Sequence, residues 1–234
     1  VRNTSRYLLG NHYDFEYKSD SIDISNLPVL DKWMLNRTAE VIDEITDAYS
    51  NFEFSKFFQT IQNFCVVDLS SFYLDIAKDR LYVSSKSDFR RRSCQTVLSL
   101  IIEKISGLIA PVLCHMAEDI WQNIPYDLEE ASVFQKGWPT VPESWRNSSF
   151  NCHVIELRKL RSLINRMLES CRNKQELGSS LEASVRVEIS DSKVQAAIDW
   201  LAQSEFNKVD VLRDWFMVSS LQIGGEPWAE VLVS

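Results

Sequence analysis

Glycine is scarce in this chain, with only six glycines among its 234 residues. None falls in a Gly-x-Gly-x-x-Gly or Gly-x-x-x-x-Gly-Lys-Ser/Thr pattern, so the sequence has no loop of the kind that cradles phosphate groups. It also has no run of about 18 apolar residues and no basic N-terminal stretch leading into an apolar core. Phosphate-cradling loops, membrane insertion and secretion are therefore not indicated.

Cysteine and histidine are too scattered to predict a zinc site. No Cys-x-x-Cys pair occurs, and no histidine stands at zinc-finger spacing from a cysteine. We expect reduced thiols that pack as small apolar side chains in a cytoplasmic protein. The five cysteines are Cys65, Cys94, Cys114, Cys152 and Cys171. With no visible nucleophile or cofactor loop, an enzyme of an unrecognised kind is the least favoured alternative.

Net charge argues against a freestanding nucleic-acid-binding protein, because 25 basic residues face 33 acidic ones, giving −8. The distribution weakens this objection. Residues 78–92 hold six basic side chains against two acidic ones, Asp79 and Asp88, a local charge of +4. Such a patch can attract phosphate even on an acidic body. The alternative, a solvated helix end and loop that contact nothing, stays open.

Helical periodicity dominates the first 125 residues and predicts a bundle. Asp31 is the expected N-cap of the second helix, and Pro111 suits the first turn of the fifth. The expected helices are 2–13, a second from 31 through at least 49, 54–77, 88–109, 111–123 and, after a long connection at 125–149, a sixth at 150–173. The aromatic residues of that connection, Phe134, Trp138 and Trp145, are expected to pack against the bundle.

Beyond residue 178 the apolar period changes to two, as in a half-buried strand: Ala183, Val185, Val187 and Ile189 alternate with polar residues. A helix at 192–203, strands at 215–219 and 228–233, and a turn at Gly224-Gly225 complete a small α/β subdomain. The predicted fold is therefore mainly α, with a helical-bundle domain at 1–149 and a long helix plus α/β subdomain at 150–234.

Residues 69–76 read Leu-Ser-Ser-Phe-Tyr-Leu-Asp-Ile, and residues 78–82 read Lys-Asp-Arg-Leu-Tyr. This segment resembles the anticodon-binding region of isoleucyl-tRNA synthetases. Five further blocks resemble the same family in the expected order: residues 2–11, 91–98, 110–121, 133–139 and 177–183. The first segment and the Gly-Ser-Ser-Leu-Glu-Ala block favour the isoleucine family, while the equivalent domain of a valyl- or leucyl-tRNA synthetase remains an alternative.

The resemblance implies a tRNA-reading part of a longer enzyme that joins isoleucine to its tRNA using ATP and magnesium. The family's His-x-Gly-His and Lys-Met-Ser-Lys-Ser types of catalytic loop do not occur in these residues, and the chain begins at Val1 rather than Met. We therefore expect a piece that has no cofactor of its own. Its expected partners are the isoleucine-specific tRNA and the catalytic domain of the same chain, with no membrane.

Cationic side chains at helix ends are the candidate RNA contacts, since Arg and Lys hold phosphates and aromatic rings stack on unpaired bases. Arg80 is the first choice for a phosphate or base contact and Tyr82 for a stack. An interhelical salt bridge is the alternative for Arg80, and at least one of the three consecutive arginines is expected to pair within the bundle. The candidates are Arg2, Asn3 and Arg6; Lys78, Arg80 and Tyr82; Arg90, Arg91 and Arg92; and Lys174.

A second class of function fits the same pattern. The bundle can serve as a helical interaction module that docks another protein domain through its Trp-rich connection, without touching RNA.

Overall fold

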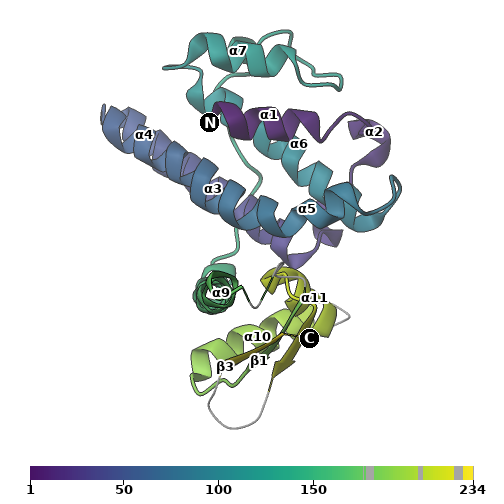
Figure 1. Cartoon of the computed structure of the whole chain (residues 1–234). Helices are drawn as coiled ribbons and strands as arrows, with labels where there is room; N and C mark the ends of the chain where they lie inside the picture. Colours follow the sequence, from purple (N-terminus) through teal and green to yellow (C-terminus); the bar gives the residue numbers. More distant parts are fainter. Residues whose placement is uncertain (176, 178–181, 205–207, 224–228, 234) are drawn as a thin grey trace. The chain divides into compact units, whose positions relative to one another are not determined.

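The computed structural model describes residues 1–175, 177, 182–204, 208–223 and 229–233 (Figure 1). The chain divides into two compact units, Val1–Asn147 and Ser148–Ser234, here called the bundle unit and the α/β unit. The prediction of a mainly α fold followed by a small α/β part is confirmed. A division into separately folding domains at 149/150 stays a prediction.

The bundle unit is built around two long helices, α3 (Val29–Ser50) and α6 (Phe89–Ile109), which pack against each other. Each apolar side chain buried between them contributes about 1.5–3 kcal/mol relative to exposure. The shorter helices of the unit are α1 (Arg2–Gly10), α2 (Tyr17–Asp20), α4 (Phe54–Asn63), α5 (Leu74–Tyr82), α7 (Cys114–Gln122) and α8 (Val133–Lys136). Helix α1 packs on α6, which fixes its exposed side relative to the core (Figure 1).

Three helix starts or ends differ from the sequence prediction. Helix α1 ends at Gly10 rather than Tyr13, because the Asn11 side-chain amide donates to the Tyr7 carbonyl at 2.8 Å and closes the last turn. Helix α3 begins at Val29 with Pro28 as its N-cap, so Asp31 lies in the first turn and is not the cap. Helix α7 begins at Cys114, leaving Pro111 in the preceding turn.

The single helix expected at 54–77 is interrupted by a π-helical segment, η2 (Phe64–Tyr73), which joins α4 to α5. Ser70 Oγ donates to the Cys65 carbonyl at 2.8 Å, within this wider turn. Such bulges inside α-helices change which side chains face the core. Here Phe64, Leu69 and Tyr73 are buried, and α5 continues to Tyr82.

The Trp-rich connection packs on the bundle through two of its three aromatic residues. Trp145 is buried, and the Trp138 indole donates to Thr46 Oγ1 at 2.9 Å while its ring meets Tyr49 edge-on. The packing expected of Phe134 is wrong, because its side chain is exposed. Pro139 lies directly against Gly107 of α6, where a side-chain carbon would not fit.

The α/β unit combines a long helix with a three-stranded sheet in the order β2-β1-β3. Strand β1 pairs parallel with β2 and antiparallel with β3, and its residues Ala183, Val185 and Val187 point into the core as their period-two spacing predicts. The elements are α9 (Ser149–Asn173), β1 (Ala183–Val187), α10 (Ser192–Ser204), α11 (Lys208–Phe216), β2 (Ser220–Ile223) and β3 (Ala229–Val233).

The strand expected at 215–219 is wrong. Helix α11 occupies the first part of that range and buries Val211, Leu212 and Trp215, which share one helical face. The strand β2 starts only at Ser220 and pairs in parallel with β1, after a connection that contains both α10 and α11. The expected turn at 224–225 and most of the block at 177–183 lie outside the described residues.

All five cysteines are free thiols, with Cys65 and Cys94 buried. In the part of the chain that the structure describes, no helix is both long and apolar enough to cross a bilayer.

Candidate nucleic-acid interface

Helix α1 presents the predicted residues Arg2, Asn3 and Arg6 to solvent on one side, while Leu8 is buried. The helix has no carboxylate of its own. It is held to α6 by polar contacts at its C-terminal end: the Gln95 amide donates to the Asn11 carbonyl at 2.8 Å, and the His12 ring lies between the Leu8 and Gln95 carbonyls. Two of its cations therefore stand on a fixed surface.

Arg80 requires a correction, because it is buried and does not face solvent. Its side chain is 4% exposed, and its guanidinium donates to Asp31, which is fully buried, at 3.3 Å. The Tyr73 hydroxyl donates to the other Asp31 oxygen. Burial raises the pKa of Asp31, and the charge of Arg80 and the hydrogen bond from Tyr73 oppose that rise. The interhelical salt bridge, the alternative for Arg80, is the arrangement found.

Arg91 and Arg92 both pair inside the bundle, as was expected of at least one of the three consecutive arginines, so their assignment as RNA contacts is corrected. The Arg91 guanidinium is buried and donates to the Leu81 carbonyl and, at 2.8 Å, to Asp14. Arg92 is mostly covered and donates to the Asp14 carbonyl at 2.8 Å. Burial alone would raise the pKa of Asp14, but hydrogen bonds from Gln95 and Arg91 hold it below its usual value.

The remaining predicted residues differ in their exposure and in the element that carries them. Lys78 is half-exposed and pairs with Asp75 at 3.2 Å, and Arg90 is half-buried near the start of α6. Tyr82, at the end of α5, is 66% exposed. Lys174 is exposed just after α9 and belongs to the α/β unit, so it is described apart from the bundle unit's residues.

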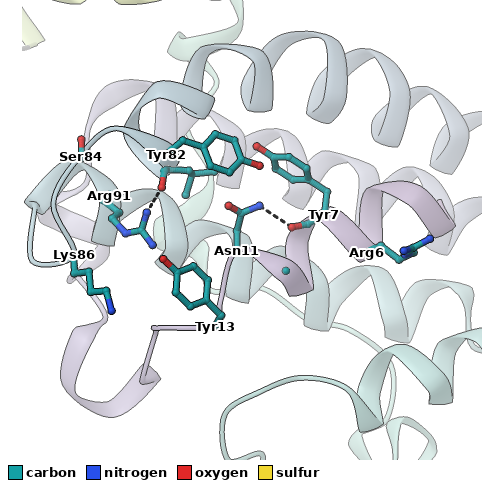
Figure 2. Close-up of a pocket in the computed structure, with 10 residues that line it drawn as sticks. Arg6, Tyr7, Asn11, Tyr13, Tyr82, Ser84, Lys86 and Arg91 are labelled. Atoms are coloured by element: carbon teal, nitrogen blue, oxygen red, sulfur yellow. Dashed lines mark hydrogen bonds between the residues drawn. The ribbon is translucent and has the colours of Figure 1, made fainter.

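A pocket of about 360 Å³ lies where the end of α1 meets the end of α5 (Figure 2). We call it the tyrosine pocket. Three of the predicted contacts line it: Arg6 and Tyr82 are exposed, whereas Arg91 is buried in its wall. Its lining residues are Arg6, Tyr7, Gly10, Asn11, Tyr13, Leu81, Tyr82, Ser84, Lys86 and Arg91.

Sequence reasoning missed Tyr7, Asn11, Tyr13 and Lys86 as members of this pocket. Lys86 was counted in the local charge, and Tyr13 was placed inside a helix that in fact stops at Gly10. Tyr13 is 71% exposed. The helix-ending signal at Gly10-Asn11, which places Tyr13 after the helix, was the available clue.

The other side of α1 borders a second groove of about 530 Å³ against α7. Arg2 and Arg6 line it from α1, and Met116, Asp119 and Ile120 line it from α7. Arg6 thus borders both hollows. This arrangement gives α1 a cationic ridge between two concave surfaces.

The described residues contain no set of side chains that could bind a metal ion. Among the described residues, no group of three or more His, Cys, Asp or Glu side chains is placed to hold a metal ion. His12 is buried between two backbone carbonyls, and its burial lowers the pKa of the ring despite both hydrogen bonds.

Comparison with known protein families identifies the class of protein to which this helical bundle and its small α/β part belong. The chain belongs to the family of the anticodon-binding domain of tRNA ligases, whose model matches residues 31–189. The expected resemblance to isoleucyl-tRNA synthetases is thereby confirmed, since close relatives carry that name.

The chain is 90% identical over its whole length to the isoleucine–tRNA ligase of Prochlorococcus marinus strain NATL1A. It is 89% identical over its whole length to that of strain NATL2A and 66% identical to that of strain MIT 9211. In each case the chain spans 24% of the length of the relative. The matched ligases are therefore much longer proteins.

Proposed function

We propose that this chain holds the anticodon stem and loop of an isoleucine-accepting tRNA, as the anticodon-binding part of an isoleucine–tRNA ligase. The single observation that carries the proposal is the exposed face of α1, with Arg2 and Arg6 and no carboxylate, in a chain of the anticodon-binding family. Guanidinium groups on a rigid helix suit the phosphates of a folded RNA.

The proposed parent reaction joins isoleucine to its tRNA at the expense of ATP, with magnesium. The described residues contain no cluster of ligands for that ion. The role that we propose for them in the parent reaction is to position the RNA. We propose the catalytic part of the same ligase as the partner of this chain. We propose the cytoplasm as its location. These proposals follow from the names of the related ligases and from the resemblance.

The net negative charge of the chain should lower its affinity for RNA. A net charge of −8 repels RNA at a distance, whereas Arg2, Arg6 and Lys86 attract it locally. Affinity of the isolated chain should therefore be weak and fall steeply with salt, with a log–log slope of about −0.7 to −0.9 for each phosphate neutralised.

A titration of labelled tRNA with the chain at two salt concentrations tests the proposal. We expect measurable binding of isoleucine tRNA at low salt, weaker binding of a non-cognate tRNA, and loss of both as salt rises. Negligible binding of either tRNA at low salt would contradict it.

The alternative of a protein-docking module is disfavoured on its own terms, because Trp138 and Trp145 of the connection pack on the bundle. The two functions are separated by reversing charge at Arg6 and Lys86, which are surface residues. Weakened RNA binding favours the first function. Reversal at Arg80 or Arg91 is not informative, since both guanidinium groups are buried.

A further inference from the structure

Two large aromatic rings stand open to solvent in the same hollow. Tyr13 follows the end of α1 and is 71% exposed, and Tyr82 ends α5 and is 66% exposed. They come from segments about seventy residues apart in sequence yet face one pocket (Figure 2). Exposed aromatic surface gathered in a concave site marks a place where a ligand is bound.

The rings are held in place before any ligand arrives. Tyr82 meets Tyr7 edge-to-face, with centroids 6.4 Å apart at 85°, and Figure 2 shows their hydroxyl groups pointing toward each other. Burial and the hydrogen bond with Tyr82 raise the pKa of Tyr7 above its usual value, so the Tyr7 hydroxyl keeps its proton. Preorganised rings lose little conformational freedom on binding.

Tyr13 is fixed by the cation behind it. The Arg91 guanidinium carbon lies 5.8 Å from the centre of the Tyr13 ring, and Arg91 is itself held by Asp14 and the Leu81 carbonyl. One face of the ring is therefore occupied by a structural guanidinium. A flat ligand would take the opposite face, since the side chain is 71% exposed.

The polar groups of the pocket suit a nucleotide. Lys86 and Arg6 lie on opposite sides of the tyrosines in Figure 2, where they can reach phosphates on either side of a bound base. The Asn11 side chain lies among the lining residues and carries both donor and acceptor groups, as base edges do. A volume of about 360 Å³ is at the small end of the range for ligand sites.

We propose that the tyrosine pocket holds one unpaired nucleobase of the bound tRNA, stacked on Tyr13 or Tyr82, with Lys86 and Arg6 on the flanking phosphates. This inference rests on the proposed function. A base inside a duplex cannot enter the pocket, because both of its faces are stacked and its pairing edge is engaged. The pocket therefore reads the loop, whereas the cationic ridge of α1 serves stem and loop alike.

The test compares two RNAs of matched length: the anticodon stem-loop of isoleucine tRNA, and a fully paired duplex with the same stem. Binding of each is measured by fluorescence anisotropy for the chain and for Tyr13→Ala, Tyr82→Ala and Tyr82→Phe. Phe58→Ala is the matched control, since Phe58 is an exposed aromatic residue on α4 of the same unit. Thermal unfolding confirms that each variant is folded.

We expect each alanine variant to bind the stem-loop about 5- to 100-fold more weakly and the duplex within about twofold of the unchanged chain. Tyr82→Phe keeps its stacking face and should bind the stem-loop like the unchanged chain, as should Phe58→Ala. Alanine variants that bind the stem-loop as tightly as the unchanged chain overturn the pocket inference and leave the proposed function standing. An unchanged chain that binds neither RNA overturns both.

A second measurement needs no variant. The stem-loop is prepared with 4-thiouridine at successive loop positions, irradiated with the unchanged chain, and the cross-linked peptides are sequenced. Cross-links to Tyr13 or Tyr82 from one loop position support the inference. Cross-links confined to peptides outside the tyrosine pocket overturn it, even where RNA binding itself is strong.

Discussion

Arg80 donates to Asp31 across the interior of the bundle, joining the end of α5 to the first turn of α3 at 3.3 Å. Both side chains are almost entirely shielded from water. An ion pair in such a place is no proof of net stabilisation, but removing one partner leaves an uncompensated buried charge. Arg80 is thus a structural residue of the bundle, and the RNA contacts are sought elsewhere.

Replacing Arg80 tests this role. Arg80→Ala should lower the free energy of unfolding by about 3–5 kcal/mol, because Asp31 is left buried without its cation. Urea denaturation followed by circular dichroism measures the change. Lys78→Ala is the control on the same helix, and its exposed pair with Asp75 predicts a change within about 0.5 kcal/mol. A stable Arg80→Ala protein that has lost only RNA affinity would restore Arg80 as a contact.

The cationic ridge of α1, together with Lys86 of the tyrosine pocket, predicts the salt dependence of tRNA binding. Neutralising Arg2, Arg6 and Lys86 together should make the log–log salt slope for tRNA binding shallower by about 2 to 3, because each removes about one phosphate contact. Anisotropy titrations over a range of salt give the slope. Lys56→Gln serves as the control, since Lys56 lies on α4 and pairs with Glu53. An unchanged slope in the triple variant contradicts the assignment of the ridge.

The buried ring of His12 predicts that the free energy of unfolding depends on pH. Burial lowers the pKa of its ring below the usual 6.5, so the unfolded chain binds a proton that the folded chain resists. The contribution of His12 to stability is therefore complete above about pH 6.5 and is lost as the pH falls below that value, by at most about 1.4 kcal/mol per pH unit.

The check is the unfolding free energy of His12→Asn and of the unchanged chain between about pH 7.5 and about pH 5.5. His12→Asn should be less stable at neutral pH but should lose less stability on acidification. His115→Gln, at an exposed position on α7, should keep the pH dependence of the unchanged chain. Parallel curves for His12→Asn and the unchanged chain would show that the ring is not buried in its neutral form.

Replacing Gly107 by alanine should destabilise the protein, although alanine has the higher helix propensity. Alanine in place of glycine inside a helix normally stabilises by about 1 kcal/mol. At Gly107 an added Cβ would lie 2.6 Å from Pro139 Cγ, so Gly107→Ala should instead lose about 1–3 kcal/mol through overpacking. Thermal unfolding of Gly107→Ala, and of Gly107→Ala with Pro139→Ala, tests this. The double variant should recover part of the loss, and a single variant more stable than the unchanged chain refutes the contact.

Sequence periodicity predicted the long helices because apolar side chains at i, i+3 and i+4 leave few other arrangements. The same spacing also predicts that Arg80 is buried, because it lies four residues after Ile76 and seven after Tyr73, on the buried face of the helix. Its charge suggested a surface position. Its buried partner, Asp31, is 49 residues away, and no local pattern reveals such a pairing.

Helix α11 was missed for a related reason. A short apolar run containing Trp215 and Phe216 fits either a strand or a helix, and the tertiary requirement for a crossover before β2 decided in favour of the helix. The tyrosine pocket was only partly predictable. Arg6 and Tyr82 were chosen by residue type, whereas the contributions of Tyr13 and Lys86 depend on how α1 ends and where the loop after α5 returns.

Hydroxyl-radical footprinting of side chains, with and without isoleucine tRNA, tests the central claim most directly. The account predicts that Tyr13 and Tyr82 lose most of their reactivity when tRNA is bound, while the exposed Phe52 and Phe58 keep theirs. Protection of Phe52 and Phe58 with unchanged labelling of both tyrosines would contradict it, because the RNA would then lie on a different face of the bundle.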